Sequence, residues 1–197
     1  RGRLQHGSGG PGQHRRTDTE GRVIGHRIRD VESRELGIPR VLELDHPGER
    51  VARHRRCLHE RLANHQLRGG SNIDQQRYIT AGLDALSKQF GILLISSVYE
   101  SVAIGFDGDN FYNLVVGIET ELCVGELSHY LKALEDKNGR RRDCPKFSAR
   151  TLDIDILTYD DTVGTKDGVL LPRQEVLENA FVLLPLAELV PDDVHPV

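Results

Sequence analysis

The chain has 197 residues, a length that suits one domain with an appendage, and its hydrophobic content of 38% indicates that part of it adds little to a core. The net charge of −4 hides a basic first third, since residues 1–70 hold 15 Arg, no Lys and 9 acidic residues. Three scattered cysteines, Cys57, Cys123 and Cys144, argue against a disulfide framework or a zinc ribbon and favour a reducing cytoplasm. The sequence contains no apolar run long enough to span a membrane.

Residues 1–66 resist a structural interpretation. Their first 16 residues are mostly Gly, His and Arg, a composition that buries too little apolar surface to offset the entropy of ordering. A basic arm for nucleic acid is the functional alternative, but only the charge count supports it, so we expect no nucleic-acid partner. The sequence therefore predicts a basic, poorly ordered N-terminal extension over residues 1–66, with a short strand within residues 38–44.

A folded domain is expected over residues 67–197. Its first helix should begin after Asp74, a suitable N-cap, and end at Gly91. Apolar residues recur at helical spacing between these two positions, at Ile79, Leu83, Leu86 and Phe90.

Two strands and a second helix follow. The strands are expected over residues 92–99 and 111–120, paired across a loop over residues 100–110, and the helix over residues 125–138. Apolar runs at residues 169–172 and 181–189 complete the chain. Because the connection between the strands is too short for a parallel crossover, this order predicts an α+β sandwich with a mainly antiparallel sheet.

Residues 150–157 carry the clearest chemical signal, because polar and apolar residues alternate there as in a half-buried strand. The apolar residues that would face the core are Leu152, Ile154 and Ile156. Asp153 and Asp155 would share the other face, where two carboxylates can hold a pair of divalent cations. The nearby arginines of residues 140–142, with Arg150, can bind phosphate oxygens. The alternative is a solvated strand with two ordinary Asp, but the context favours a phosphoryl-transfer site.

Residues 69–196 resemble the 6-hydroxymethyl-7,8-dihydropterin pyrophosphokinase family, over about two-thirds of the chain. The segments that carry the resemblance, in order and with the family's gaps, are Gly70-Ser71-Asn72 and residues 97–101, 111–116, 119–120, 134–135, 139–140, 150–157, 171–172 and 181–186. The resemblance implies a ferredoxin-like α/β sandwich that acts as a cytoplasmic monomer. It would transfer the terminal diphosphate of ATP to the hydroxymethyl group of the pterin, releasing AMP, in folate biosynthesis.

The resemblance also implies a metal site and an ATP site. Two Mg²⁺ would bind Asp153 and Asp155, and replacing either Asp with Ala should remove activity and leave the fold intact. The implied catalytic residues are Arg140, Arg150, Asp153 and Asp155. The implied ATP-binding residues are Glu135, Arg140, Arg142, Arg150 and Arg173. For Glu135, an ordinary position on a helix surface remains the alternative.

The pterin would be held by stacking and by hydrogen bonds to its edge. The resemblance places two aromatic rings, Phe147 and Phe181, on either side of the flat heterocycle. It makes Asn113 the amide that reads the pterin edge. The positions implied for the pocket wall are Ser101, Ile104 and Phe111, of which Ile104 and Phe111 could instead be plain core residues.

Several positions depart from the family pattern. Where the family commonly has a His-Tyr pair and an Arg, this chain has Arg173, Gln174 and Asn179. Arg173 could keep a cation near the ATP phosphates, and Lys132 replaces a polar amide near the nucleotide. The changes leave open a second function, a non-catalytic or weakly active relative that binds pterin or nucleotide. Residues 63–68 also lack the apolar alternation of the family's first strand, so no regular strand is expected there.

Overall fold

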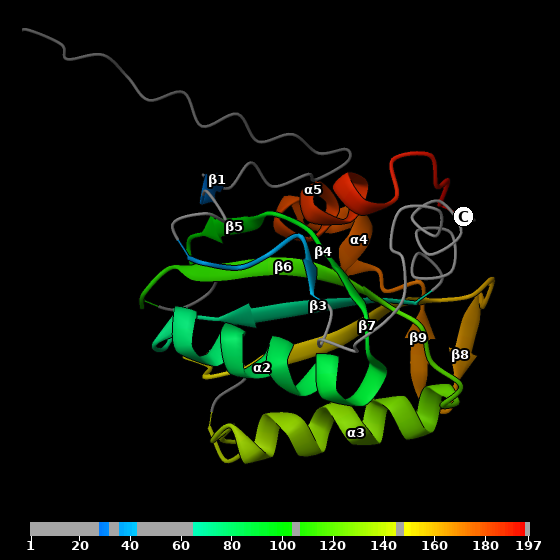
Figure 1. Cartoon of the computed structure of the whole chain (residues 1–197), viewed down its shortest axis with the longest axis horizontal. Helices are drawn as coiled ribbons and strands as arrows, with labels where there is room; N and C mark the ends of the chain where they lie inside the picture. The colour runs from blue at the N-terminus through cyan, green and yellow to red at the C-terminus, as the bar shows by residue number, and fades with distance from the viewer. Residues whose placement is uncertain (1–27, 32–35, 43–64, 104–106, 145–147, 196–197) are drawn as a thin grey trace, which may run out of the picture.

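The structure, a computed structural model, describes residues 28–31, 36–42, 65–103, 107–144 and 148–195. Within these ranges the chain forms a seven-stranded sheet with helices on both faces (Figure 1). Every strand pair in this sheet is antiparallel. The predicted α+β sandwich with a mainly antiparallel sheet is therefore confirmed.

The strand that organises the sheet is β3 (His65–Ser71), which lies between β6 (Phe111–Ile118) and β7 (Asp153–Tyr159). The remaining strands of the sheet are β5 (Val98–Ser101) and β4 (Leu93–Ile95), which both pair with β6, then β1 (Ile28–Val31) beside β5 and β2 (Val41–Leu42) beside β4. A separate hairpin joins β8 (Gly164–Lys166) to β9 (Val169–Leu171).

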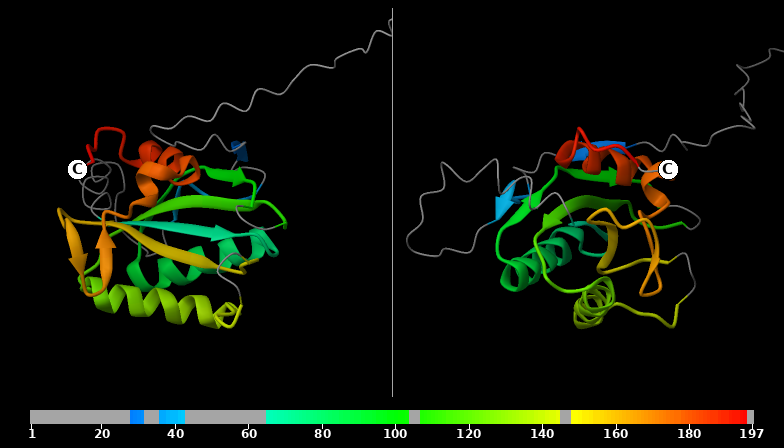
Figure 2. Two further views of the ribbon diagram at one scale, coloured as in Figure 1. Left: turned by 180° about the vertical axis from the view of Figure 1, so that it is seen from behind. Right: turned by 90° about the vertical axis from the view of Figure 1, so that its right-hand side faces the viewer.

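The helices form a layer on each side of the sheet, as the two turned views show (Figure 2). One layer consists of α2 (Gln75–Phe90) and α3 (Val124–Lys137), and the other of α4 (Glu175–Glu178) and α5 (Ala180–Leu189). As predicted, α2 begins after Asp74 and ends at Gly91, whose φ of 77° breaks the helix. The Asp74 side chain makes no capping hydrogen bond and lies beside Arg77 instead.

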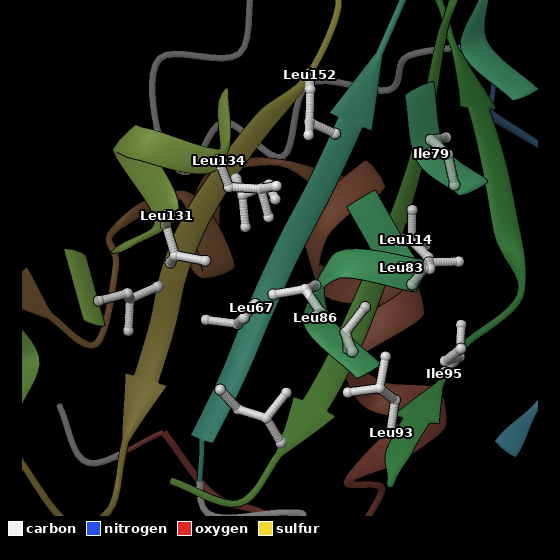
Figure 3. Packing of buried hydrophobic residues seen from close by; sticks show 14 of the residues in the cluster. Leu67, Ile79, Leu83, Leu86, Leu93, Ile95, Leu114, Leu131, Leu134 and Leu152 are labelled. Atoms are coloured by element: carbon white, nitrogen blue, oxygen red, sulfur yellow. The ribbon is translucent and has the colours of Figure 1, made fainter. Parts of the chain in front are cut away.

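The main hydrophobic core fills the space between the sheet and the layer of α2 and α3 (Figure 3). Leu67 and Leu114 of the sheet pack there against the buried face of α2, which presents Ile79, Leu83 and Leu86. Burial of such side chains is the main force that holds a helix on a sheet. A smaller cluster, centred on Val115 and Leu157 of the sheet with Val182, Leu186 and Leu189 of α5, holds the opposite layer.

The absence of a regular strand at residues 63–68 was a wrong expectation, because β3 begins at His65. Alternation is missing because this central strand is buried on both faces, so its polar side chains need partners rather than solvent. Gln66 accepts a hydrogen bond from Thr158, and Arg68 pairs with carboxylates on β7.

The strand expected over residues 92–99 is instead two strands, β4 and β5, with a break at Ser96 and Ser97. The pairing with β6 takes up one extra residue at this break, which is a β-bulge. Both the backbone N–H and the hydroxyl of Ser96 bond to the backbone of Val115, so the bulge stays attached to β6. Beyond the bulge, β5 runs to Ser101, into the segment expected to be a loop. The Ser101 hydroxyl therefore lies beside Asn113.

Part of the segment expected to be an extension contributes to the sheet, through β1 and β2. Arg40, next to β2, donates a hydrogen bond to the Ser97 hydroxyl at 2.7 Å and forms an ion pair with Glu188 of α5. Residues 1–27, 32–35 and 43–64 lie outside the described ranges. Among the helices that the structure describes, none has both the length and the apolar character needed to cross a bilayer.

Candidate active site

A cavity of about 600 Å³ opens at the edge strand β7, and residues of the sheet, of α3 and of α4 and α5 line it. Its polar and aromatic lining residues include Arg68, Ser101, Phe111, Asn113, Lys132, Glu135, Arg140, Arg142, Arg150, Asp153, Asp155, Arg173, Glu175, Asn179 and Phe181. Every site residue predicted within the described ranges lies on this wall. A second hollow, of about 720 Å³ near Thr158, has no Arg or Lys among its described lining residues, so phosphate has no cationic partner there.

Two rows of residues cross the sheet beneath the cavity. Directly opposed residues on antiparallel strands place their side chains on the same face. One row runs from Asp153 through Gly70 to Asn113, and the next puts Asp155 opposite Arg68. Gly70 is buried and has no side chain between the carboxylate and the amide, and a Cβ there would touch the amide, 3.4 Å from Asn113 Oδ1. The strand register therefore places the predicted metal ligand Asp153 and the predicted pterin-binding residue Asn113 on one face of the sheet, on either side of Gly70.

Three arginines surround the carboxylate of Asp153, which is only 5% exposed. Arg68 and Arg150 each donate a hydrogen bond to Oδ2 at 2.5 Å, and Arg140 Nη1 lies 3.3 Å from Oδ1. Burial alone would raise the pKa of Asp153, but the three guanidinium groups outweigh it and hold the pKa below its ordinary value. Asp153 is therefore an ionised carboxylate at neutral pH.

Asp155 is more exposed than Asp153 and has two arginine partners. Arg68 Nη2 lies 3.1 Å from Oδ2, and Arg173 Nη2 lies 2.7 Å from Oδ1. Since one Arg68 nitrogen contacts both carboxylates, the two Asp side chains converge on a common point. This geometry differs from the alternative of two independently solvated Asp on a strand surface.

Glu135 of α3 is buried rather than on the helix surface, with 6% of its area exposed. Its Oε1 accepts a hydrogen bond from the backbone N–H of Ile154 at 2.8 Å, and its Oε2 accepts one from Arg142 at 2.9 Å. Burial raises the pKa of Glu135 above its ordinary value, although the hydrogen bond from Ile154 opposes the shift. The carboxylate thus fastens the outer edge of β7 to α3 and holds Arg142 at the cavity.

Two buried guanidinium nitrogens on the cavity wall, Nε of Arg68 and Nε of Arg140, donate no hydrogen bond to any residue in the described part of the chain. Buried donors are normally satisfied, so such atoms indicate that a partner is missing. A phosphate group suits arginine donors because its oxygens accept several charge-assisted hydrogen bonds at once. The basic end of the cavity therefore has the chemistry of an anion site.

The Gly70-Ser71-Asn72 segment at the end of β3 fixes two loops around the cavity through the buried side chain of Asn72. Its Oδ1 accepts a hydrogen bond from the backbone N–H of Arg150 at 2.6 Å, and its Nδ2 donates one to the carbonyl of Asp109 at 3.1 Å. The Asn72 N–H also donates to the Arg150 carbonyl. These bonds fix the backbone of Arg150 just before β7 begins at Asp153.

The other end of the cavity contains the predicted pterin residues. Asn113 is 1% exposed, and its Nδ2 donates a hydrogen bond to the Ser101 hydroxyl at 3.0 Å. Phe111 and Phe181, both half-buried, come from β6 and α5 and line the same wall. Ile104 and Phe147 lie outside the described residues.

The positions that depart from the family pattern separate into two groups. Arg173 and Asn179 line the cavity, and Arg173 reaches Asp155. Gln174 instead donates a hydrogen bond to Glu178 on the exposed surface of α4. Lys132 lies on the cavity wall, on the exposed side of α3.

Arg68 is the site residue that sequence reasoning missed. It stood in a segment without alternation, where no strand was expected and no facing could be assigned. A usable signal existed, because Arg68 is two residues before Gly70 and would share its face of any strand. A lone cation on a strand beside the Asp-x-Asp strand is a natural cross-strand partner for those carboxylates.

The two carboxylates fit divalent cations in chemistry and in placement. Mg²⁺ is held in proteins by one or two carboxylates, with waters and substrate phosphates completing its six positions. Asp153 and Asp155 converge within 2.5 and 3.1 Å of one nitrogen, at the wall where unpartnered arginine donors mark an anion site. These two residues would hold the metal, and the anion would supply further ligands.

Comparison with known proteins agrees with this site. The family model described as 7,8-dihydro-6-hydroxymethylpterin-pyrophosphokinase matches residues 67–191. The chain is 36% identical over 130 residues to the 2-amino-4-hydroxy-6-hydroxymethyldihydropteridine pyrophosphokinase of Aquifex aeolicus, covering 65% of this chain and 81% of that protein. It is also 36% identical over 127 residues to the protein of the same name from Methylorubrum extorquens, covering 62% of this chain and 80% of that one.

A larger protein matches as well. The chain is 31% identical over 166 residues to the folic acid synthesis protein fol1 of Pneumocystis carinii, covering 76% of this chain but only 22% of that protein. The family model covers more than half of the chain, including β3, β6, β7 and the arginine–aspartate cluster. The chain therefore belongs to the 7,8-dihydro-6-hydroxymethylpterin-pyrophosphokinase family.

Proposed function

We propose that this chain binds ATP and 6-hydroxymethyl-7,8-dihydropterin side by side in the 600 Å³ cavity, with Asp153 and Asp155 as ligands of two Mg²⁺. Enzymes of its family transfer diphosphate from ATP to this pterin in folate biosynthesis. One observation carries the proposal for this chain: the arginine–aspartate cluster and the Asn113 end share one cavity, joined over Gly70.

The reaction joins the hydroxymethyl oxygen of the pterin to the β-phosphorus of ATP. The bond from that phosphorus to the α-phosphate oxygen breaks, so AMP leaves, and the hydroxyl proton passes to solvent. Such a transfer needs alignment and charge neutralisation more than covalent help from the protein. We assign the phosphate contacts to Arg140, Arg150 and Arg173, and Mg²⁺, when bound, would neutralise further phosphate charge.

We assign the pterin to the other end of the cavity. Asn113 can read donors and acceptors on the heterocycle edge, and its buried amide is held in place by Ser101. Phe111 and Phe181 offer faces on which a planar ring can stack. Phe147 belongs to the same proposal from the family resemblance.

Further proposals concern the protein around the site. The family resemblance implies a monomer, and we propose that state for this chain. Cys123 and Cys144 are free thiols, which supports a reducing, cytoplasmic location. We propose residues 67–197 as the catalytic domain and residues 1–66 as the N-terminal extension, two strands of which pair with the domain sheet.

The test is AMP formation from Mg²⁺-ATP with and without the pterin, using the full chain, Asp155→Ala and Asp84→Ala. Loss of Asp155 should lower pterin-dependent AMP formation by a factor of roughly 100 or more. The Asp84→Ala control makes the same charge change on the exposed side of α2 and should keep wild-type activity. Circular dichroism checks that each variant is folded.

Two outcomes would redirect the proposal. Pterin-dependent AMP formation that survives Asp155→Ala would remove Asp155 from the metal site. Stoichiometric binding of pterin or ATP by the folded full chain, without any AMP, would instead favour the non-catalytic relative.

A further inference from the structure

Arg68 occupies the point on which the two proposed metal ligands converge. Its Nη2 lies 2.5 Å from Asp153 Oδ2 and 3.1 Å from Asp155 Oδ2, and its side chain is 10% exposed. The sheet register places it there, because Arg68 stands directly opposite Asp155 and Gly70, two residues along, opposite Asp153. The contacts of Arg68 with both carboxylates thus follow from its position on the central strand.

A guanidinium group and a divalent cation cannot share these oxygens, because their like charges repel strongly at such short range. The surrounding charges add to this conflict. Four guanidinium groups, those of Arg68, Arg140, Arg150 and Arg173, face three carboxylates, the two of β7 and Glu175 beside Arg173, which leaves an excess of one positive charge. The cluster repels a free dication and attracts a polyanion such as the ATP triphosphate.

We propose that Arg68 competes with the metal for Asp153 and Asp155, so that divalent cations enter this site together with the nucleotide rather than before it. Arg68 holds the two carboxylates together while no metal is present. The triphosphate then gives the guanidinium another anionic partner and frees the carboxylate oxygens. This inference rests on the proposed function, since it takes the two Asp as metal ligands.

The structure provides space for Arg68 to change partners. Gly70 lies two residues further along the same face of β3, and a Cβ there would stand 3.7 Å from Arg68 Nη1. Arg68 itself lines the cavity, so its guanidinium group lies beside the space that a nucleotide would occupy. The Nε of Arg68 also donates no hydrogen bond within the described residues, so this side chain is anchored only at its tip.

The experiment measures Mn²⁺ binding to the full chain by electron paramagnetic resonance, without nucleotide. The variants are Arg68→Gln, which removes the charge, and Arg68→Lys, which keeps it. Arg68→Gln should bind Mn²⁺ roughly tenfold more tightly than wild type, or more, because the competing cation is gone. Arg68→Lys should stay near wild type.

The matched control is Arg141→Ala, which makes the same charge change at an exposed arginine paired with Asp143. It should change Mn²⁺ affinity by less than about twofold, since an exposed charge is screened by solvent. Unchanged or weaker Mn²⁺ binding by folded Arg68→Gln would overturn the proposal. If Arg68→Gln does not fold, Mn²⁺ binding to the wild type tests the proposal instead. Saturable binding at micromolar Mn²⁺ without nucleotide would equally overturn the proposal.

This readout is independent of turnover. AMP formation by the wild type with unaltered Mn²⁺ affinity in Arg68→Gln would refute the competition alone. Tighter Mn²⁺ binding by Arg68→Gln, in a chain that forms no AMP, would refute the proposed reaction and leave the competition standing.

Discussion

The two faces of the central sheet differ in chemistry although the same strands form both. The face toward α2 and α3 is closed by apolar side chains such as Leu67, Leu114 and Val116. The face toward α4 and α5 is apolar under α5 but carries the arginine–aspartate cluster and Asn113 in the open cavity. One face supplies the packing and the other presents the site.

The comparison shows how packing can position charges. Along β7, Ile154 and Ile156 are fixed in the core, so Asp153 and Asp155, which alternate with them, are held toward the cavity. Along β3, Leu67 does the same for its neighbour Arg68. A functional group on a rigid strand is placed more accurately than one on a loop, which suits a reaction that depends on alignment.

The largest expected effect is on the charged face. Asp153→Ala should lower the free energy of unfolding at pH 7 by about 3–5 kcal/mol, because it leaves three arginines without their shared carboxylate. The structure thus changes the expectation that the fold would be untouched. Since the pKa of Asp153 is lowered in the folded state, its stabilisation is present above the ordinary carboxyl pKa and is lost as the pH falls through the lowered value.

Urea unfolding at pH 7 measures this effect, with Asp155→Ala as the comparison. That second variant should cost only about 1 kcal/mol, because Asp155 is more exposed and has two arginine partners. Equal losses from the two variants would contradict the different burial of the two carboxylates.

The packed face should respond differently. Leu67→Ala empties a fully buried position on β3 and should lower the free energy of unfolding by about 3 kcal/mol. Its effect on kcat should be within a few-fold, because Leu67 points away from the cavity that Arg68 faces. Urea unfolding and steady-state AMP formation measure the two effects. A large fall in kcat for folded Leu67→Ala would show that packing on one face of the sheet affects catalysis on the other.

Much of this molecule is predictable from local pattern. The helix over 75–90 follows from apolar spacing and a terminating Gly91, and the facing of Asp153 and Asp155 follows from strict alternation. These features depend on contacts close in sequence or on the simple period of a strand. The family resemblance then supplied roles for residues that the pattern alone could not rank.

The rest depends on partners distant in sequence. β3 looked unlike a strand because the side chains of Gln66 and Arg68 find hydrogen-bond partners on β7, about ninety positions later. The break at Ser96 depends on pairing with Val115. The burial of Glu135 depends on the edge of β7. A polar residue with such a partner appears solvated in the sequence and is buried in the fold.

Gly70 tests whether the distance between Asp153 and Asn113 across the sheet matters to function. Gly70→Ala should leave stability within about 1 kcal/mol, because the new Cβ meets its neighbours at ordinary contact distances of 3.4 and 3.7 Å. It should raise the KM for pterin or ATP by about tenfold, because the methyl group narrows the passage between Asp153 and Asn113. Ala at Gly69, on the other face, is the control and should not alter KM. Unchanged kinetics for Gly70→Ala would show that the substrates do not meet over this residue.

The smallest expected effect concerns Glu135, where the packed and charged regions meet at the edge of β7. Because its pKa is raised in the folded state, Glu135 contributes stability that is complete below the ordinary carboxyl pKa and is lost as the pH rises through the raised value. Glu135→Gln keeps an acceptor for the Ile154 N–H but has no charge to bury. Between pH 4 and pH 7 the free energy of unfolding of this variant should therefore rise relative to that of the wild type, by about 1 kcal/mol or less.

Thermal unfolding of both proteins across this pH range measures the trend. Glu135→Ala is the control, since it removes the acceptor and, because neither variant titrates at this position, should be about 1 kcal/mol less stable than Glu135→Gln at every pH. If Glu135→Gln instead becomes less stable than the wild type as the pH rises, the ion pair with Arg142 outweighs the cost of burying the charge. The ionised carboxylate would then stabilise the fold. If Glu135→Gln becomes more stable than the wild type as the pH rises, burial of the charge is the larger effect, and the ion pair that holds Arg142 at the cavity lowers the stability of the fold.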